Sequence, residues 1–120
     1  MTTHSVNPQQ FLPLTPAVFN VLLALAEEDK HGYAILQSIT QRTNGKVRMG
    51  TGTLYGIIKR LLADGWIEEL AERPDPSLDD ERRRYYRLTR LGALIASAEA
   101  ERLAQLVKAA HQHGLLPNLE

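Results

Sequence analysis

Between Gly50 and Gly65, the apolar residues fall at the spacing of one face of an α-helix. They recur at i, i+3, i+4, i+7 and i+8, and the remaining positions are small or polar. This period predicts a helix over residues 50–65 whose apolar stripe is buried. The stripe consists of Leu54, Ile57, Ile58, Leu61 and Leu62.

The opposite face of this predicted helix is slim and basic. Gly52 and Gly56 add no side-chain bulk there, Lys59 and Arg60 add positive charge, and no acid precedes Asp64. A helix with a buried apolar face and a narrow cationic face suits a groove lined by phosphates. The pattern therefore favours contact with duplex DNA.

Three further stretches have helical patterns with recognisable ends. Thr15 followed by Pro16 is typical of an N-cap and a first helical residue, and Thr89 is expected to cap the last helix. The expected helices span residues 16–27, 33–42 and 90–113, with a turn at 27–30 and an extended link or edge strand at 46–49.

Alternation replaces the helical period from Trp66 onward. Residues 66–70 and 84–88 favour strands, and Pro74 and Pro76 mark a turn-rich segment between them. Three helices followed by a two-stranded ribbon give a winged helix-turn-helix, a mainly α member of the α+β class. The expected organisation is an extended arm (1–13), a winged helix-turn-helix domain (14–88), a C-terminal dimerisation helix (89–113) and a tail (114–120).

The last predicted helix has apolar residues in two sets. The first set centres on Leu91, Leu94, Ile95 and Ala98, and the second lies about 110° further round the axis at 100° per residue. We therefore predict that the first half packs on its own domain and the second on a second copy. The alternative is that both halves of the helix pack within one monomer. The predicted interface residues are Leu103, Leu106, Val107 and Ala110, with Phe11 and Leu12 from the arm.

Charge is segregated along a chain whose net charge is zero. Residues 30–63 contain six basic residues and no acid, residues 64–81 are strongly acidic, and residues 82–90 are basic again. A fold that joins the two basic blocks would have a positive face on a neutral molecule. The alternative is that these charges are scattered over the surface and serve only to keep it solvated.

Composition argues against several other classes. The chain has no Cys and no apolar run of membrane-spanning length, so we expect a cytoplasmic protein without disulfides or membrane contact. Its Ser and Gly residues lack the settings of hydrolase and phosphate-loop motifs, and its His residues form no convincing metal set. We expect no enzyme activity, no cofactor and no metal.

Four segments in order resemble the PadR (phenolic acid decarboxylase regulator) family of bacterial transcription factors. They are LTPAVFNVLLAL at 14–25, HGYAI at 31–35, GTLYGIIKRLLADGWIEE at 52–69 and RRRYYRLTRLG at 82–92. The resemblance implies a winged-helix homodimer that usually represses transcription and is often released by a small molecule. The single C-terminal helix is similar to the shorter subfamily, and Gly56 replaces a Pro that the family often has.

These observations predict which side chains contact DNA. The helix at residues 50–65 would enter the major groove, its start would meet a phosphate, and the wing would reach phosphates or the minor groove. The predicted contacts are Tyr55, Lys59 and Arg60 in the groove, Thr51 and Thr53 at the helix start, Lys46 and Arg48 on the flanking backbone, and Arg82, Arg83 and Arg84 on the wing.

Two questions stay open at this level. A winged-helix module that binds proteins and not DNA is the main alternative, although it has no need for a long acid-free block. A small apolar or aromatic effector could occupy a cleft between protomers, lined by the first helix and by Leu103, Leu106 and Val107. Plain dimer packing is the simpler role of those three residues.

Overall fold

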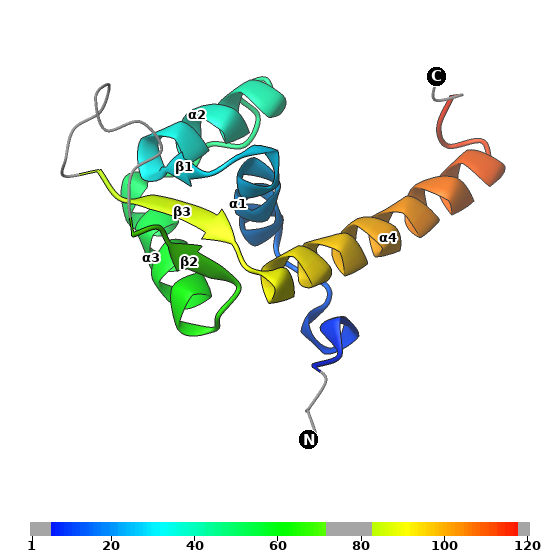
Figure 1. Ribbon diagram of the computed structural model, residues 1–120. Coiled ribbons are helices and arrows are strands. Elements are labelled where there is room, and N and C mark those ends of the chain that lie inside the picture. Colours follow the sequence, from blue (N-terminus) through cyan, green and yellow to red (C-terminus); the bar gives the residue numbers. More distant parts are fainter. Residues whose placement is uncertain (1–5, 72–82, 118–120) are drawn as a thin grey trace.

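Three helices and a small sheet form the body of the chain, and a long helix extends from it (Figure 1). The computed structural model describes residues 6–71 and 83–117. The predicted winged-helix fold, mainly α within the α+β class, is confirmed for these residues. Their elements are η1 (Pro8–Phe11), α1 (Pro16–Glu27), β1 (Lys30–His31), α2 (Gly32–Arg42), α3 (Thr51–Ala63), β2 (Ile67–Glu69), β3 (Tyr85–Leu88) and α4 (Arg90–Gln112).

Side-chain caps set the starts of the helices. The Thr15 hydroxyl accepts a hydrogen bond from the Val18 amide at 3.1 Å, and α1 has the predicted bounds. Helix α2 begins at Gly32, one residue earlier than predicted, because His31 is its N-cap. The Nδ1 atom of His31 accepts the Ala34 amide at 3.2 Å.

The sheet has a strand that the sequence did not reveal. Strand β1 pairs antiparallel with β3, Lys30 opposite Tyr86 and His31 opposite Tyr85, and the strand order is β1-β3-β2. Strands β2 and β3 form the predicted two-stranded wing. The prediction of a turn ending at Lys30 was wrong, because Lys30 begins a third strand on the other side of β3. A strand of two residues is too short to show alternation, and its pairing is fixed by contacts more than 50 residues away in the chain.

One other segment differs from the predictions, whereas residues 46–49 form a link without strand pairing, which was one of the two predicted alternatives. Pro8–Phe11, expected to be extended, form a 3-10 helix, and its N-cap Asn7 accepts the Gln9 amide at 3.0 Å. The Phe11 ring packs edge-on against Trp66 of the same chain, with 5.3 Å between ring centroids.

The core is centred on α1, which contacts α2, α4 and β3. The predicted stripe of α3 packs against this core: Leu54, Ile58 and Leu61 are buried, and Ile57 and Leu62 are partly buried. Trp66 is also buried, at the junction of α3 and β2. The other fully buried apolar residues include Val21, Leu22, Ala24, Ile35 and Ile95.

Helix α4 has one inward stripe and not two. Its buried residues are Gly92, Ile95, Ala96 and Glu99, whereas Leu94, which was assigned inward, is 46% exposed. At 100° per residue, this buried set and the apolar set of the second half point within about 20° of each other. The predicted 110° offset was therefore wrong, because the first predicted set included the exposed Leu94 and left out Gly92, Ala96 and Glu99.

Only the first half of this stripe is covered by the chain itself. Leu106 and Val107 in the second half are 56% and 38% exposed, and Figure 1 shows this end of α4 clear of the other helices. Leu103 and Ala110 are partly buried. An apolar stripe thus continues past the edge of the body.

Close backbone contacts fix the direction of α4. The Trp66 carbonyl accepts the Thr89 amide at 3.1 Å, and the Thr89 hydroxyl donates to the Gly65 carbonyl at 2.6 Å. A Cβ at Gly92 would collide with the Trp66 carbonyl oxygen. A residue without a side chain is therefore required where α4 crosses the start of the wing.

Candidate nucleic-acid interface

The polar face of helix α3 is exposed to solvent and lies opposite its buried apolar stripe. Thr51, Thr53, Tyr55, Lys59 and Arg60 are all exposed, so both basic side chains lie where the sequence places them. The helix begins after Gly50, whose position provides no side-chain cap, so the first amides of α3 are not occupied by a capping side chain. This end of α3 suits an anion.

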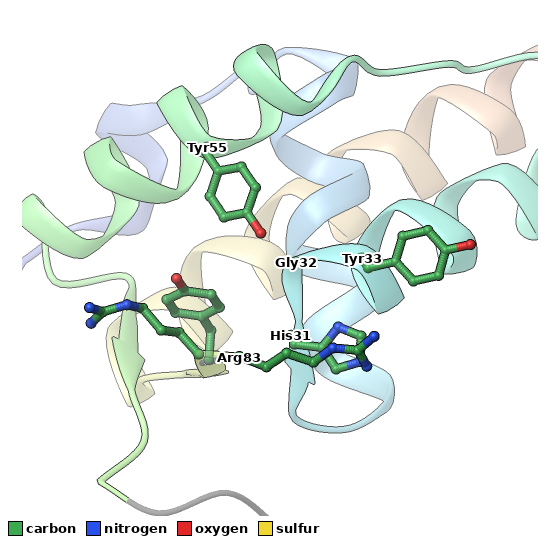
Figure 2. A pocket seen from close by; sticks show the side chains of 7 residues that line it. His31, Gly32, Tyr33, Tyr55 and Arg83 are labelled. Atoms are coloured by element: carbon green, nitrogen blue, oxygen red, sulfur yellow. The ribbon is translucent and has the colours of Figure 1, made fainter. Parts of the chain in front are cut away.

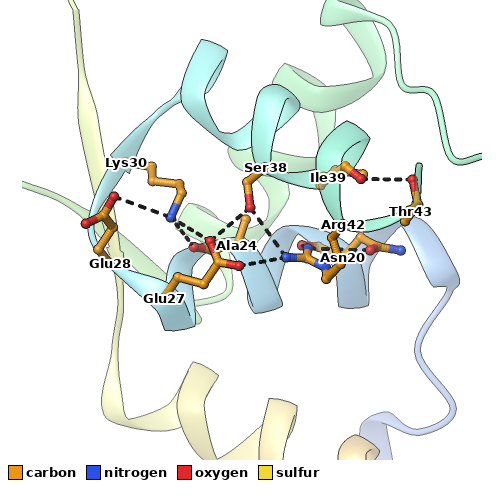
Figure 3. Close-up of polar contacts among 9 residues, drawn as sticks. All are labelled: Asn20, Ala24, Glu27, Glu28, Lys30, Ser38, Ile39, Arg42 and Thr43. Atoms are coloured by element: carbon orange, nitrogen blue, oxygen red, sulfur yellow. Dashed lines mark hydrogen bonds and ion pairs between the residues drawn. The ribbon is translucent and has the colours of Figure 1, made fainter. Parts of the chain in front are cut away.

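Two of the six basic residues in the acid-free block belong to the fold and not to a positive face. Lys30 is buried, and its Nζ donates to the Ala24 carbonyl at 2.9 Å and to Glu27 at 3.0 Å. Arg42 donates to the other oxygen of Glu27 at 3.0 Å (Figure 3). Hydrogen bonds from Lys30 and Ser38 lower the pKa of Glu27.

The other four basic residues of the block remain available. Lys46, Arg48, Lys59 and Arg60 are exposed, and none forms an ion pair with a carboxylate of residues 6–71 or 83–117. They come from α3 and from the link that precedes it. This link and helix therefore carry four exposed positive charges within a chain of zero net charge.

The wing arginines have local partners. Arg84 pairs with Glu69 on the neighbouring strand at 3.0 Å, and Nη1 of Arg83 lies 2.9 Å from Nε2 of His31. Arg83 and Arg84 are nevertheless exposed. Arg82, which was predicted to act with them, lies outside the described residues.

A pocket of about 340 Å³ lies between the start of α2, α3 and β3. It brings Tyr55 and the wing arginines together with His31, Tyr33 and Tyr86, to which the sequence assigned no contact with DNA. These residues come from three separate parts of the chain, at 31–33, 55 and 83–86, so no local pattern could have joined them. The one available sign was their aromatic character, which more often indicates packing.

Other kinds of site find little support in the described residues. Residues 6–71 and 83–117 contain no cluster of three or more His, Cys, Asp or Glu that could hold a metal ion. Within the same residues, no helix combines the length and the apolar character needed to span a bilayer.

Comparison with known proteins identifies relatives of the chain. The family model described as the transcriptional regulator PadR-like family matches residues 21–97. An uncharacterised protein, protein X of Lysinibacillus sphaericus, is 36% identical over 86 residues, which cover 72% of this chain and 76% of that protein.

Solved structures share the fold. A PadR family transcription regulator from Clostridium difficile R20291 is 23% identical, with a TM-score of 0.65 over 80% of this chain and 95% of that chain. Bordetella bronchiseptica BpsR is 24% identical, with a TM-score of 0.60 over 84% of this chain and 70% of that chain. That structure addresses how 6-hydroxynicotinic acid regulates the binding of BpsR to DNA.

Proposed function

The chain belongs to the PadR-like family of transcriptional regulators, and we propose that it acts as a homodimeric repressor on an inverted-repeat DNA operator. Regulators of this family bind DNA and are not enzymes, so the chain is a DNA-binding regulator of transcription. The repressor role, the dimer, the operator and any effector are parts of the proposal.

The exposed basic face of α3 carries the proposal. Lys59 and Arg60 project from the side opposite the buried stripe, and a Cβ added at Gly52 or Gly56 would meet no atom of another element within 4 Å. A helix this narrow can approach base edges closely in the major groove. Lys59 and Arg60 would then read bases, and Thr51 and Thr53 would meet a phosphate.

The uncovered half of the α4 stripe supports the homodimer. Leu103, Leu106, Val107 and Ala110 continue the direction of the buried residues of α4 beyond the body. A second copy related by a two-fold axis would cover this stripe and present a second α3. Two such helices predict half-sites separated by about one turn of DNA or a multiple of it. Phe11 and Leu12 would lie at the margin of this interface, because both already pack on their own chain.

An effector would act through the same dimer. The regulation of BpsR by 6-hydroxynicotinic acid supports a small aromatic ligand for this chain as well. We place it in the cleft between protomers, beside α1 and the exposed Leu106 and Val107. A ligand there would shift the spacing of the two α3 helices and so change operator affinity.

Selection of binding sites from random duplexes tests the proposed function. The full chain is expected to enrich an inverted repeat, and its binding should weaken steeply as salt is raised. Lys59→Ala or Arg60→Ala should relax the preference at one base of each half-site. No enrichment, together with retention on duplex DNA that ignores ionic strength, would favour a protein-interaction module.

A further inference from the structure

The pocket between α2, α3 and β3 is lined by three of the residues predicted to contact DNA, namely Tyr55, Arg83 and Arg84. Figure 2 shows Tyr55 reaching from α3 toward Gly32, and Arg83 reaching toward His31 at the start of α2. Tyr86 lines the same pocket from β3. The pocket therefore joins the helix that would enter the groove to the base of the wing.

Tyr86 supplies an unused hydrogen-bond donor. The residue is only 4% exposed, yet among the described residues its hydroxyl has no hydrogen-bond partner. Because every fully enclosed side-chain polar atom of the described residues has a partner, this hydroxyl must open onto the pocket. Burial, followed by repulsion from Glu69 and Tyr55, raises the pKa of Tyr86, so the phenol stays protonated and can donate.

Three other residues that line the pocket add further donors. Tyr55 is 49% exposed and contributes a second phenol, and Arg83 and Arg84 contribute guanidinium groups. The carboxylate of Glu69 holds Arg84, but their side chains are 39% and 69% exposed, respectively. An exposed ion pair is weak enough for a stronger acceptor to replace it.

We propose that this pocket seats one phosphate of the DNA backbone, with the hydroxyls of Tyr55 and Tyr86 and the wing arginines as donors. Phosphate oxygens accept hydrogen bonds only, so they match a pocket rich in hydroxyl and guanidinium donors. The inference rests on the proposed DNA-binding function and adds a contact site to it. It assigns Tyr86, an apparent core residue, to DNA affinity.

Tyr86→Phe provides the test, because it removes one hydroxyl and leaves the buried ring. The variant should fold as the wild type does, since the hydroxyl has no partner among the described residues. In fluorescence anisotropy with the selected duplex, its affinity should fall about tenfold, the size expected for one charge-assisted hydrogen bond. The loss should be equal on specific and unrelated duplexes, because a phosphate carries no sequence information.

Two further variants sharpen the result. Tyr55→Phe should reduce affinity in the same way, and because its ring is half-exposed the substitution should leave folding unchanged. Tyr85→Phe is the matched control, because neighbouring residues of β3 face opposite sides and Tyr85 does not line the pocket. It should bind as the wild type does.

Three outcomes would overturn the inference. Wild-type affinity in both Tyr86→Phe and Tyr55→Phe, with Arg60→Ala weakened, would refute the phosphate seat while leaving the DNA-binding function intact. Relief of duplex binding by millimolar inorganic phosphate at constant ionic strength, equally in wild type and Tyr86→Phe, would place the anion elsewhere. A wild-type chain that binds no duplex would refute the proposed function itself.

Discussion

The phenol of Tyr55 lies directly against the backbone of Gly32, and a Cβ at Gly32 would collide with its hydroxyl and ring carbons. Tyr55 belongs to the first turns of α3, and Gly32 is the first residue of α2. The absence of a side chain at Gly32 thus sets how closely α3 and α2 approach beside the pocket. Both residues lie within segments that resemble the family.

Gly32→Ala should lower DNA affinity several-fold by displacing Tyr55. The half-exposed ring can rotate into solvent, so the free energy of unfolding should change by no more than about 1 kcal/mol. Anisotropy titrations in a double-mutant cycle with Tyr55→Ala check the mechanism. In the Tyr55→Ala background, Gly32→Ala should have no further effect, and an equal loss in both backgrounds would show that Gly32 acts by another route.

The same substitution should have opposite effects at two other helical glycines. Gly92→Ala forces a Cβ into the Trp66 carbonyl, which is backbone and cannot rotate away, so we expect a loss of about 3 kcal/mol. Gly56→Ala meets no atom within 4 Å and should stabilise the helix by about 0.5–1 kcal/mol. Urea unfolding of the two variants measures both effects. Similar midpoints would contradict the close contact at Gly92.

The environment of Glu99 predicts that the free energy of unfolding falls at acidic pH. This carboxylate is 2% exposed, and Arg102 donates two hydrogen bonds to it at 2.8 Å each. These bonds, together with one from the Leu14 backbone, outweigh burial and lower the pKa of Glu99 below 4.5. Because the folded-state pKa is the lower one, the stabilisation is complete above the unfolded pKa and is lost as pH falls through the folded value.

Glu99→Gln isolates this contribution from other carboxylates such as Glu27. At neutral pH the variant should be less stable by about 1–2 kcal/mol, because a charge-assisted pair becomes a neutral one. Thermal melts between about pH 6 and pH 3 should show the wild type approaching the variant as Glu99 is protonated. A constant difference across that range would contradict the assignment.

Leu106→Glu should dissociate the proposed dimer. The substitution places a charge in the exposed apolar stripe of α4, where a second copy would bury it without a partner. Light scattering after size exclusion should give the monomer mass for the variant and the dimer mass for the wild type. Lys108→Glu is the control, because Lys108 lies on the side of α4 away from the stripe. An unchanged mass for Leu106→Glu would place the interface elsewhere.

Local signals in the sequence predicted the helices well. The Thr15-Pro16 cap gave both bounds of α1 together with its apolar period, and the stripe of α3 predicted which of its residues are buried. Capping and periodicity depend on neighbours within a few residues, so they can be read from a single chain.

Features that depend on distant partners were not predictable in this way. Strand β1 forms by pairing with β3, where Lys30 lies opposite Tyr86. Arg42 on α2 does not contribute to the basic face, because it forms an ion pair with Glu27 on α1. Glu99 was missed because a charged residue in an inward stripe becomes favourable only with Arg102 beside it. The pocket around Tyr86 likewise combines three separate elements.

The most direct measurement of the central claim is the affinity of the wild type and of Arg60→Ala for selected and unrelated duplexes over a range of salt concentrations, with Lys108→Ala as the control. If α3 reads DNA, Arg60→Ala should cost about 1–3 kcal/mol on the selected duplex and much less on an unrelated one, at every salt concentration. Lys108→Ala should match the wild type. Equal affinities of wild type and Arg60→Ala for the selected duplex would contradict a DNA-reading role for the basic face of α3.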